Sequence, residues 1–479
     1  MNGRRDVLIV GAGISGLTVA YFLRRAGVSV TVVDPGDVPG GTMKTVMDGG
    51  WMVETGPNSA LETTPLFGEM FDGLGIAGER LYADAAAERR YILRDGVLHP
   101  LPMSPGAFLS SSLWSAAGKL RLMKEPFVGR GKQEETVAQF VRRRLGEEFL
   151  DYAIDPFVAG VYAGDPSALS VRAAFPKLYA LEERYGGLIR GMVRGAGERR
   201  KRAEKAKDRA RMFSFRTGMQ TFPIALGRSL GDELRLGCTA TSVERITSSR
   251  GGAPAFVVRY LRDGEQGSLE APLLVLAVPA YIAGELVRPF SESAGAALDR
   301  IFYPPVAEVF LGFPASRVGR PLDGFGYLIP AKEKRKILGT IWSSALFPGR
   351  APAGHVALTT FVGGAREPSL TGIDDTALTG IVASELRSLM GVTGDPVYAK
   401  IIRWEKAIPQ YNLGHPALVE EIRDLERRVP GLYLCGNYRG GIALGDCLMS
   451  GESLARRIAG DVRGEAPGDA RSRGEELDQ

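Results

Sequence analysis

Apolar and polar positions in the first 35 residues predict a strand, a helix and a second strand. Asp6–Val10 is a short aliphatic, β-branched run of the kind that forms a buried parallel strand. Apolar residues then recur at helical spacing from Leu17 until Gly27, which is a helix stop signal. Val28–Val33 is another strand-like run. The pattern therefore predicts a complete βαβ unit of about 30 residues.

Farther along the chain the pattern alternates between strands and helices. Asp95-Gly96 is a strong hairpin signal between Tyr91–Leu93 and Val97–Leu101. Residues 104–212 are mostly helical in pattern. Later elements include a helix near Asp374–Met390, a helix over about Gly445–Ala459, and strands at Trp51–Val53, Ala255–Tyr260, Leu273–Ala277, Val306–Phe313, Val356–Val362 and Leu432–Leu434. The pattern predicts an α/β fold.

The turn between the first strand and the first helix carries the candidate chemistry. It reads Gly11-Ala12-Gly13-Ile14-Ser15-Gly16, which is the G-x-G-x-x-G pattern of dinucleotide-binding folds. We call this pattern the fingerprint. Its glycines permit a tight turn, close approach of a diphosphate, and close packing of helix on strand. The helix N-terminus offers amide donors and partial positive charge. Asp34 ends the second strand, where it is placed to accept hydrogen bonds from ribose hydroxyls.

A second G-x-G-x-x-G, Gly73–Gly78, follows a helix instead of a strand. We interpret it as a helix end and a turn that binds no ligand.

Two features favour FAD over NAD. Gly40-Gly41 follows Asp34 closely, so a second loop can pass near the cofactor. At the far end of the chain, Leu432–Asn437 is a buried strand that runs into a glycine turn, and Gly440-Gly441 precedes another helix. The chain thus returns to close a discontinuous FAD-binding domain. There is also no second well-placed fingerprint to hold NADPH.

Composition and charge narrow the function further. The 479 residues exceed one ordinary domain, and 44% hydrophobic with 24% charged residues excludes wholesale disorder. The net charge is +5, but the segment Arg190–Arg216 alone carries 11 Lys/Arg against three acids. Its basic residues from Arg190 to Arg211 have no aromatics among them, and Phe213 and Phe215 stand only at its end, so we expect no nucleic acid partner. A solvated segment and a contact with an acidic membrane surface or anionic ligand both remain open.

Cysteine, histidine and hydropathy patterns exclude several classes of protein. Three cysteines make no disulfide framework, and three histidines far apart make a zinc site unexpected, so we predict no metal. No stretch approaches 18 uninterrupted apolar residues, so no membrane-spanning helix is expected. The apolar run Val7–Val10 is too short for a signal peptide. These patterns predict a cytoplasmic protein, and peripheral contact with the inner face of a membrane stays open.

Six strings together resemble one known family. They are VGAGISGL (10–17), PGGT (39–42), ETGPNS (54–59), GVYAGD (160–165), IPQYNLGH (408–415), and the glycine-rich stretch 436–447 ending in Asp446-Cys447. Their order resembles the protoporphyrinogen oxidases, the porphyrinogen-oxidising branch of the monoamine-oxidase-like flavoproteins. The resemblance covers about residues 6–460. The strings at 160–165 and 408–415 are more specific to this branch than the fingerprint.

The resemblance implies an activity. Such enzymes bind FAD non-covalently and pass hydride from a porphyrinogen to the flavin, and oxygen or another acceptor reoxidises it. Forming protoporphyrin IX from protoporphyrinogen IX removes six electrons in three flavin cycles, with hydrogen peroxide as the product of oxygen. This implies a place in heme biosynthesis. The aromatic product drives the reaction, so positioning the macrocycle matters more than acid–base help.

Site residues carry over where the motifs match. The cofactor contacts would be Gly11, Ala12, Gly13, Ile14, Ser15, Gly16, Asp34, Gly41, Thr42, Gly56, Pro57, Asn58, Ser59, Val243, Trp404, Gly436, Ile442, Ala443 and Leu444. Arg90 would pair with a substrate propionate, since a guanidinium suits a carboxylate. The walls of the porphyrinogen cavity would be Gly160, Phe325, Gly326, Leu328, Ile341 and Phe361.

Two of these positions, Asn58 and Asp34, and the nearby Val38 need comment. Asn58 is a candidate for steadying charge at the reacting carbon, although after Gly-Pro it is first a turn residue. The family usually has glutamate where Asp34 stands and arginine where Val38 stands. These departures affect how the cofactor phosphates and ribose are held.

The same resemblance suggests a division of the chain. We expect an FAD-binding domain (1–83, 213–284 and 432–463), an α+β substrate domain (84–103 and 285–431), a helical domain (104–212) and a disordered tail (464–479). In the helical domain, Leu109, Leu113, Leu120 and Met123 form an apolar stripe. In related enzymes the corresponding domain faces a membrane and admits apolar substrate; core packing is the other interpretation.

Alternative functions stay open. Coproporphyrinogen III is a second substrate for such a site, and an amine oxidase shares the fold. A membrane-associated flavin-binding protein without activity is the non-enzymatic alternative. The sequence leaves open whether the chain forms a homodimer.

Overall fold

The computed structural model describes residues 6–87, 89–194, 210–247 and 253–464. A five-stranded parallel sheet lies at one end, in the order β10-β2-β1-β14-β20. Its strands are β1 (Val7–Val10), β2 (Val30–Val33), β10 (Leu234–Arg235), β14 (Leu273–Leu276) and β20 (Leu432–Leu434). Strands from the two ends of the chain therefore share one sheet, as a discontinuous domain requires.

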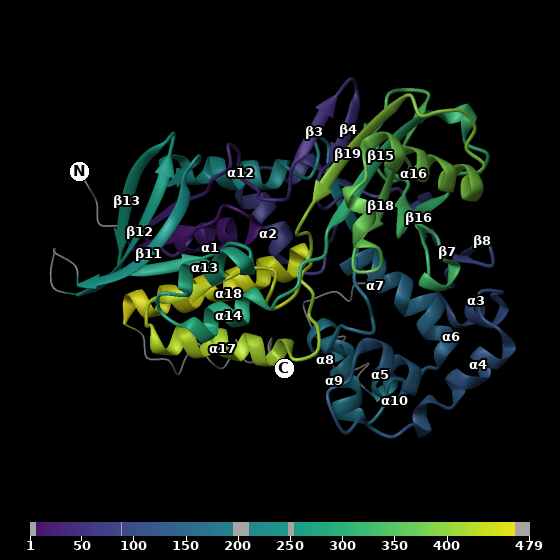
Figure 1. The fold of residues 1–479 in the computed structure, drawn as a ribbon, viewed down its shortest axis with the longest axis horizontal. Helices are drawn as coiled ribbons and strands as arrows, with labels where there is room; N and C mark the ends of the chain where they lie inside the picture. Colours follow the sequence, from purple (N-terminus) through teal and green to yellow (C-terminus); the bar gives the residue numbers. More distant parts are fainter. Residues whose placement is uncertain (1–5, 88, 195–209, 248–252, 465–479) are drawn as a thin grey trace.

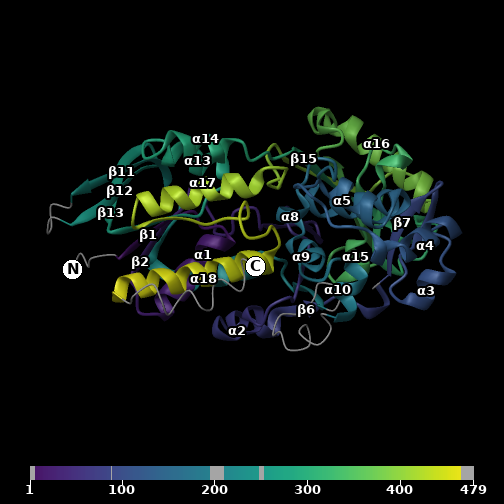
Figure 2. The same ribbon diagram turned by 90° about the horizontal axis from the view of Figure 1, so that it is seen from below.

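Alternate side chains of this sheet pack on two opposite layers. Val7 and Ile9 face the layer of α1 (Ile14–Arg25) and α18 (Leu444–Arg463), which lie side by side in Figures 1 and 2. Leu8 and Val10 face the other layer, made of α13 (Ala280–Val287), α14 (Glu292–Asp299), α17 (His415–Arg428) and the sheet β11 (Thr239–Thr247), β12 (Pro254–Arg262) and β13 (Glu265–Ala271). Burial on both faces explains the unbroken apolar runs of these strands.

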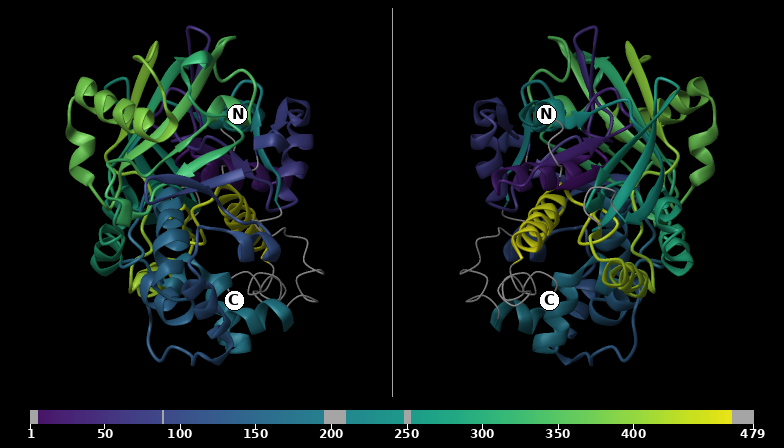
Figure 3. Two further views of the ribbon diagram at one scale, coloured as in Figure 1. Left: turned by 90° about the vertical axis from the view of Figure 1, so that its right-hand side faces the viewer. Right: turned by 90° about the vertical axis from the view of Figure 1, so that its left-hand side faces the viewer.

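A mixed seven-stranded sheet forms the second part of the fold, in the order β19-β15-β18-β17-β16-β7-β8. Its strands are β7 (Arg89–Arg94), β8 (Val97–Pro100), β15 (Val306–Pro314), β16 (Gly324–Leu328), β17 (Gly339–Ile341), β18 (His355–Gly363) and β19 (Tyr398–Trp404). One face, including Val309 and Tyr327, packs against α16 (Asp375–Met390). We call the opposite face the inner face. Figure 3 shows α16 on the outer side of this sheet.

A helical layer lies below the seven-stranded sheet in Figures 1 and 3. Its helices are α3 (Pro105–Ser110), α4 (Ala116–Met123), α5 (Val137–Arg144), α6 (Glu147–Phe149), α7 (Asp155–Tyr162), α8 (Val171–Ala174), α9 (Pro176–Tyr185) and α10 (Leu188–Arg194), with a π-helical turn at Leu150–Ile154. Within it the fully buried Arg144 pairs with Glu125 and Glu182. Phe140 and Val158 pack in its core.

Short elements connect these parts: α2 (Leu66–Gly73), α12 (Thr221–Leu230), α15 (Ser343–Leu346), β3 (Thr45–Asp48), β4 (Trp51–Glu54), β5 (Ala60–Leu61), β6 (Arg80–Tyr82) and β9 (Met212–Phe215).

A buried group of charged side chains links these short elements to the part of the fold that contains the seven-stranded sheet. The guanidinium of Arg350 lies 3.1 Å from Glu54 on β4 and donates to Ser214 on β9. Glu54 also accepts from Thr45 Oγ1 at 2.6 Å and from the Met219 amide at 2.9 Å.

The predicted elements are largely confirmed. The βαβ unit, the hairpin at Asp95-Gly96, and the predicted strands and helices all occur, with ends shifted by a few residues. The second glycine pattern is indeed a helix end, since α2 ends at Gly73 and Gly75 has φ +70°. The last helix starts at Leu444 and continues past Ala459 to Arg463. Residues 465–479 of the predicted tail and 195–209 of the basic segment lie outside the described residues.

The predicted apolar stripe of the helical layer has to be corrected in part. Leu113 is fully buried beside Trp114 and Tyr152, so it belongs to the core. Leu109, Leu120 and Met123 are 70%, 60% and 71% exposed. The four residues therefore do not share one environment, because the chain turns between α3 and α4 and directs Leu113 inward.

Candidate functional site

The fingerprint glycines serve two different purposes. Gly11 has φ +109°, and a Cβ there would lie 2.4 Å from the Ala277 carbonyl oxygen. A Cβ on Gly16 would lie 2.0 Å from the Gly11 carbonyl oxygen. Glycine is therefore required at both positions, because the protein's own backbone leaves no room for a side chain. At Gly13, in contrast, a Cβ would meet nothing within 4 Å. The space in front of Gly13 is therefore open to a ligand.

The start of α1 is suited to an anion. Gly13 is its N-cap and supplies no side-chain acceptor, and the first turn contains no acidic residue. The first-turn amides have no intrahelical acceptor and add to the positive end of the helix dipole. A diphosphate placed over Gly13 would accept from these amides.

A second glycine loop lies against the first. The Gly40 amide donates to the Ala12 carbonyl at 2.8 Å, and Gly13 and Gly40 form an isolated bridge. Gly41 has φ +60°, and a Cβ there would lie 3.4 Å from Gly13 Cα. The expected second loop is thus next to the fingerprint.

Asp34 supports the first loop directly. Its carboxylate accepts from the Ala12 amide at 2.7 Å and from the Gly36 amide at 2.8 Å, through different oxygens. Each oxygen has a further lone pair, so the carboxylate can also accept from a ribose hydroxyl. The Cys238 amide donates to the Asp34 carbonyl at 2.8 Å, which places the start of β11, the strand of Val243, beside it. Val243 itself has a buried side chain.

The segment Thr55–Asn58 joins the fingerprint lobe to the inner face of the seven-stranded sheet. Trp404 Nε1 donates to the Thr55 carbonyl at 2.7 Å. Asn58 Nδ2 donates to Glu308 Oε1 at 2.8 Å and to the Gly56 carbonyl at 3.3 Å. A Cβ on Gly56 would lie 2.2 Å from the Thr42 carbonyl oxygen, so this segment also touches the second glycine loop.

The predicted substrate residues share the inner face. Across neighbouring strands, Arg90 is paired with Gly326 and Gly326 with Ile341. In the next row, Leu328 pairs with Gly339, which pairs with Phe361. Leu328 also packs against Gly160 of α7, where a Cβ would lie 2.5 Å from Leu328 Cδ2. The structure therefore brings Arg90, Gly160, Gly326, Leu328, Ile341 and Phe361 together, with Phe325 at the strand irregularity beside Arg90.

Arg90 differs from its neighbour Arg89. Arg89 is exposed and pairs with Asp323 at 2.7 Å. The Arg90 guanidinium is half-buried, lies 5.9 Å from the centre of the Phe325 ring, and has no ion pair among the described residues. Burial lowers its pKa. An arginine withdrawn from water without a carboxylate partner can bind an external anion, so Arg90 is a candidate for that role.

The two family-specific strings contact each other. Gln410 Nε2 donates to the Tyr162 carbonyl at 2.8 Å, and Leu169 and Asn412 form a bridge. Tyr411 Oη donates to the Asn437 carbonyl at 2.6 Å and accepts from the Gly441 amide at 3.1 Å. The strings thus attach the helical layer to the turn that precedes α18, which contains Gly436, Ile442 and Ala443 and leads to Leu444.

Sequence reasoning missed Glu308. Its side chain is only 2% exposed and lies on the inner face, directly across from Phe361. Burial raises its pKa to about 8, with a smaller contribution from Glu54, while the hydrogen bond from Asn58 opposes the shift. The signal was available: Glu308 is the one acid in the strand run Val306–Phe313, in which every other residue is apolar or glycine.

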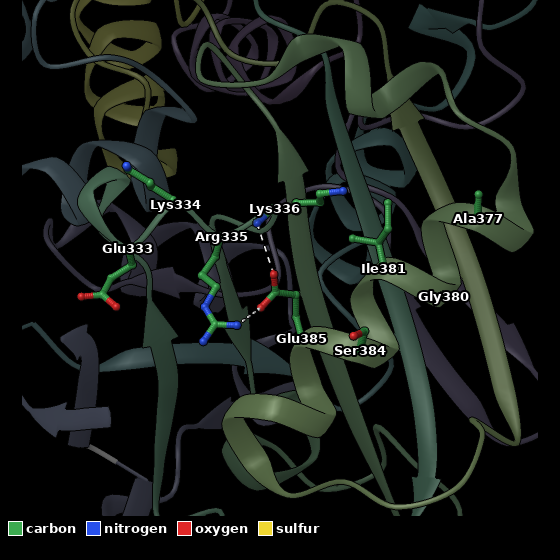
Figure 4. A pocket seen from close by; sticks show the side chains of 9 residues that line it. All are labelled: Glu333, Lys334, Arg335, Lys336, Ala377, Gly380, Ile381, Ser384 and Glu385. Atoms are coloured by element: carbon green, nitrogen blue, oxygen red, sulfur yellow. Dashed lines mark hydrogen bonds and ion pairs between the residues drawn. The ribbon is translucent and has the colours of Figure 1, made fainter. Parts of the chain in front are cut away.

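A separate groove of about 730 Å³ lies on the other side of the sheet (Figure 4). It is lined by Glu333, Lys334, Arg335, Lys336, Ala377, Gly380, Ile381, Ser384 and Glu385. Arg335 and Glu385 pair across it at 3.3 Å. None of the predicted site residues lines this groove, so we place the candidate site on the inner face.

Comparison with known proteins identifies the family. Residues 14–459 match the model of the flavin containing amine oxidoreductases, so the chain belongs to this family. The family implies FAD, and the open space at Gly13 together with the uncapped start of α1 fits its diphosphate. Within the described residues, no helix is long and apolar enough to cross a membrane.

Individual relatives span nearly the whole chain. Protoporphyrinogen oxidase 2 of Arabidopsis thaliana is 34% identical, covering 94% of this chain and 93% of the relative. Coproporphyrinogen III oxidase of Bacillus subtilis is 28% identical, covering 94% and 97%. A solved structure from Exiguobacterium sp. 255-15, provisionally described as a protoporphyrinogen oxidase, has a TM-score of 0.78 at 23% identity, covering 96% and 100%, and supports the fold.

The different roles of Gly13 and Gly16 allow a test of whether this loop binds the diphosphate. We expect Gly13→Val to fold but to lose flavin, because its side chain fits the protein and fills the space for the diphosphate. The purified variant should be colourless, with a thermal midpoint close to that of flavin-stripped wild type.

Gly16→Ala is the matched control. Its Cβ collides with the Gly11 carbonyl, so we expect the apoprotein itself to be destabilised. Full flavin absorbance in Gly13→Val would contradict the assignment of the loop.

Proposed function

We propose that this chain is an FAD-dependent porphyrinogen oxidase that converts protoporphyrinogen IX to protoporphyrin IX, with oxygen as acceptor and hydrogen peroxide as product. One observation supports it most: Arg90, a half-buried cation without a partner among the described residues, stands at one end of an apolar wall. A flat apolar macrocycle with carboxylate tails matches that combination. The Arabidopsis and Bacillus relatives, a protoporphyrinogen oxidase and a coproporphyrinogen III oxidase, support the same substrate class.

The residues of the two glycine loops would hold FAD without a covalent bond. Its diphosphate would lie at Gly13 and the start of α1, its ribose near Asp34, and its ring near Thr55–Asn58 and Trp404. When bound, the flavin supplies the hydride acceptor. The chain's own residues hold the macrocycle in place: Arg90 fixes a propionate, while Leu328, Phe361 and Gly160 give it a flat apolar surface that excludes water.

The charge on the wall favours two carboxylates over four. Of the seven predicted substrate-binding residues, which are Arg90 and the six wall residues, Arg90 alone is charged. Coproporphyrinogen III carries two more propionates than protoporphyrinogen IX, and binding it would need further cations. An amine substrate fits this site less well than either porphyrinogen, because Arg90 would repel its positive charge. We therefore propose protoporphyrinogen IX, with coproporphyrinogen III as the second candidate on the strength of its relatives.

The domain division follows from this assignment. The parallel-sheet part would be the FAD domain, the seven-stranded sheet the substrate domain, and the helical layer the domain that closes the site through Gly160.

We propose a second, peripheral contact between the helical layer and an anionic membrane surface. Met103, Leu109, Leu120, Met123 and Phe127 are between 60% and 84% exposed. Lys119 and Lys124 come from the same stretch. Exposed apolar residues interleaved with cations suit the interface of an anionic bilayer.

Removing the Arg90 guanidinium tests the substrate assignment. We expect Arg90→Ala to raise KM for protoporphyrinogen IX roughly 10-fold or more, since a hydrogen bond to a charged group contributes about 1.5–3 kcal/mol. Flavin content should not change, because Arg90 contacts Phe325 on the substrate side.

Arg89→Ala is the control, since Arg89 is exposed and should leave KM near wild type. Both proteins should be assayed with coproporphyrinogen III as well. A KM for Arg90→Ala equal to that of Arg89→Ala would refute the role of Arg90.

Replacing exposed apolar side chains tests the membrane contact. We expect the double variant Leu109→Ser/Met123→Ser to bind anionic vesicles at least roughly 10-fold more weakly, because each buried apolar side chain contributes about 1.5–3 kcal/mol. Vesicle sedimentation measures this directly.

The double variant Val397→Ser/Leu413→Ser removes exposed apolar residues elsewhere, 54% and 46% exposed, and serves as the control. Identical vesicle affinity of the two double variants would contradict the proposed surface.

A further inference from the structure

A buried carboxyl lies on the inner face with very little to neutralise it. Glu308 is 2% exposed in a strand whose other residues are apolar or glycine. Its hydrogen bond comes from Asn58 Nδ2, at 2.8 Å to Oε1. Among the described residues no cation pairs with it, and Oε2 accepts no hydrogen bond. An acid kept in such a place without a cation to pair with is costly, which points to a use.

The register places Glu308 between the proposed flavin and substrate contacts. It is directly opposite Phe361 on β18 and Ile402 on β19. Trp404 is two residues farther along the same face of β19, opposite Val306. Arg90 lies four strands away on the same face, roughly 19 Å at the usual strand spacing of about 4.8 Å. A macrocycle held at Arg90 by its propionate would thus extend toward Glu308.

Among the described residues, no charged group around Glu308 offsets the effect of burial on its pKa, which stays near neutral pH. Glu54 is close enough to raise its pKa, but Glu54 is itself paired with Arg350 at 3.1 Å. On β19, Lys400 is half-buried on the same face one row away, and Arg403 points to the other face, where it pairs with Asp375. On β18, Phe361 and Thr359 face it without charge. Burial dominates and raises the pKa of Glu308 to about 8.

We propose that Glu308 is the proton acceptor of this site, taking the pyrrole N–H proton that the porphyrinogen must release as each hydride leaves. The inference rests on the proposed function. Asn58 acts as a positioning residue: its amide N–H groups are held by Glu308 and by the Gly56 carbonyl, so it keeps the carboxyl facing the site.

The step balances in atoms and electrons. A C–H bond of the macrocycle breaks, and its electron pair leaves with the hydrogen as hydride to the flavin. A pyrrole N–H bond breaks, its electron pair forms the new ring double bond, and its proton goes to a carboxylate oxygen of Glu308. The carboxylic acid then releases that proton to water before the next of the three oxidations. After the third oxidation, one proton moves from the fourth meso carbon to a ring nitrogen, which leaves the porphyrin with one hydrogen on each meso carbon and two N–H groups.

Glu308→Gln tests the inference, since it keeps the shape and removes the capacity to take a proton. We expect the anaerobic rate of flavin reduction by protoporphyrinogen IX to rise in wild type as pH increases through about 8. In Glu308→Gln the rate should fall by roughly 10²–10⁴-fold and lose this pH dependence. Glu308→Asp, which retains a carboxyl, should recover part of the rate.

A spectroscopic measurement does not depend on turnover. In substrate-free, FAD-loaded protein, the infrared difference between wild type and Glu308→Gln should show a carboxylic acid band that disappears as pH rises through about 8. Glu385→Gln is the control. Glu385 pairs with Arg335 on the opposite side of the sheet (Figure 4) and should change neither the pH profile nor this band.

The outcomes separate the two levels of the argument. If wild type reduces its flavin with porphyrinogen and Glu308→Gln does so with the same rate and pH profile, this inference is wrong and the proposed function stands. A band that is absent throughout the pH range also overturns it. If wild-type flavin is not reduced by any porphyrinogen, the proposed function fails, and the inference fails with it.

Discussion

The candidate site depends on the short segment that connects its two halves. Trp404 donates to the Thr55 carbonyl and Asn58 donates to Glu308, so residues 55–58 are fixed against β15 and β19. The same segment packs through Gly56 against the loop that lies beside Gly13. Two sheets of different topology are thereby held in one geometry. Without these contacts the diphosphate loop and the apolar wall would each exist, but their relative position would be undefined.

Charge is used sparingly within this geometry. The described part of the inner face places an unpaired cation, Arg90, toward one end, and a buried acid, Glu308, toward the other, with Leu328 and Phe361 between them. Among the described residues, other charges that are fully buried are paired, as Arg350 is with Glu54 and Arg144 with Glu125 and Glu182. These pairs hold the protein together, whereas Arg90 and Glu308 lie where a ligand would complete them. This contrast, more than any motif, supports a site for a flat acid substrate.

Local sequence patterns predicted what local physics determines. The βαβ unit follows from apolar runs, a glycine turn and a helix stop, and the structure reproduces it closely. The distinct roles of Gly11, Gly13 and Gly16 could be expected from the motif, although the distances at which a Cβ would clash could come only from the structure.

The sequence did not lead to Glu308, because the predicted chemistry demands little acid–base help. Its isolation in an apolar strand was nevertheless visible in the sequence. What the pattern could not supply was the strand order that puts Arg90, Phe361 and Glu308 on one face, since β7 and β15 lie far apart in the chain. The apolar stripe was wrong at Leu113 for a related reason, because helical spacing assumed across a turn does not hold.

The central claim is that one site holds a flavin and a porphyrinogen together. The most direct test is a single anaerobic mixing of the purified, FAD-loaded protein with a limiting amount of protoporphyrinogen IX, following flavin absorbance and porphyrin fluorescence at once. We expect the flavin to bleach as porphyrin fluorescence appears, with three flavins reduced for each porphyrin formed. Porphyrin that appears no faster than in a protein-free solution, while the flavin stays oxidised, would contradict it.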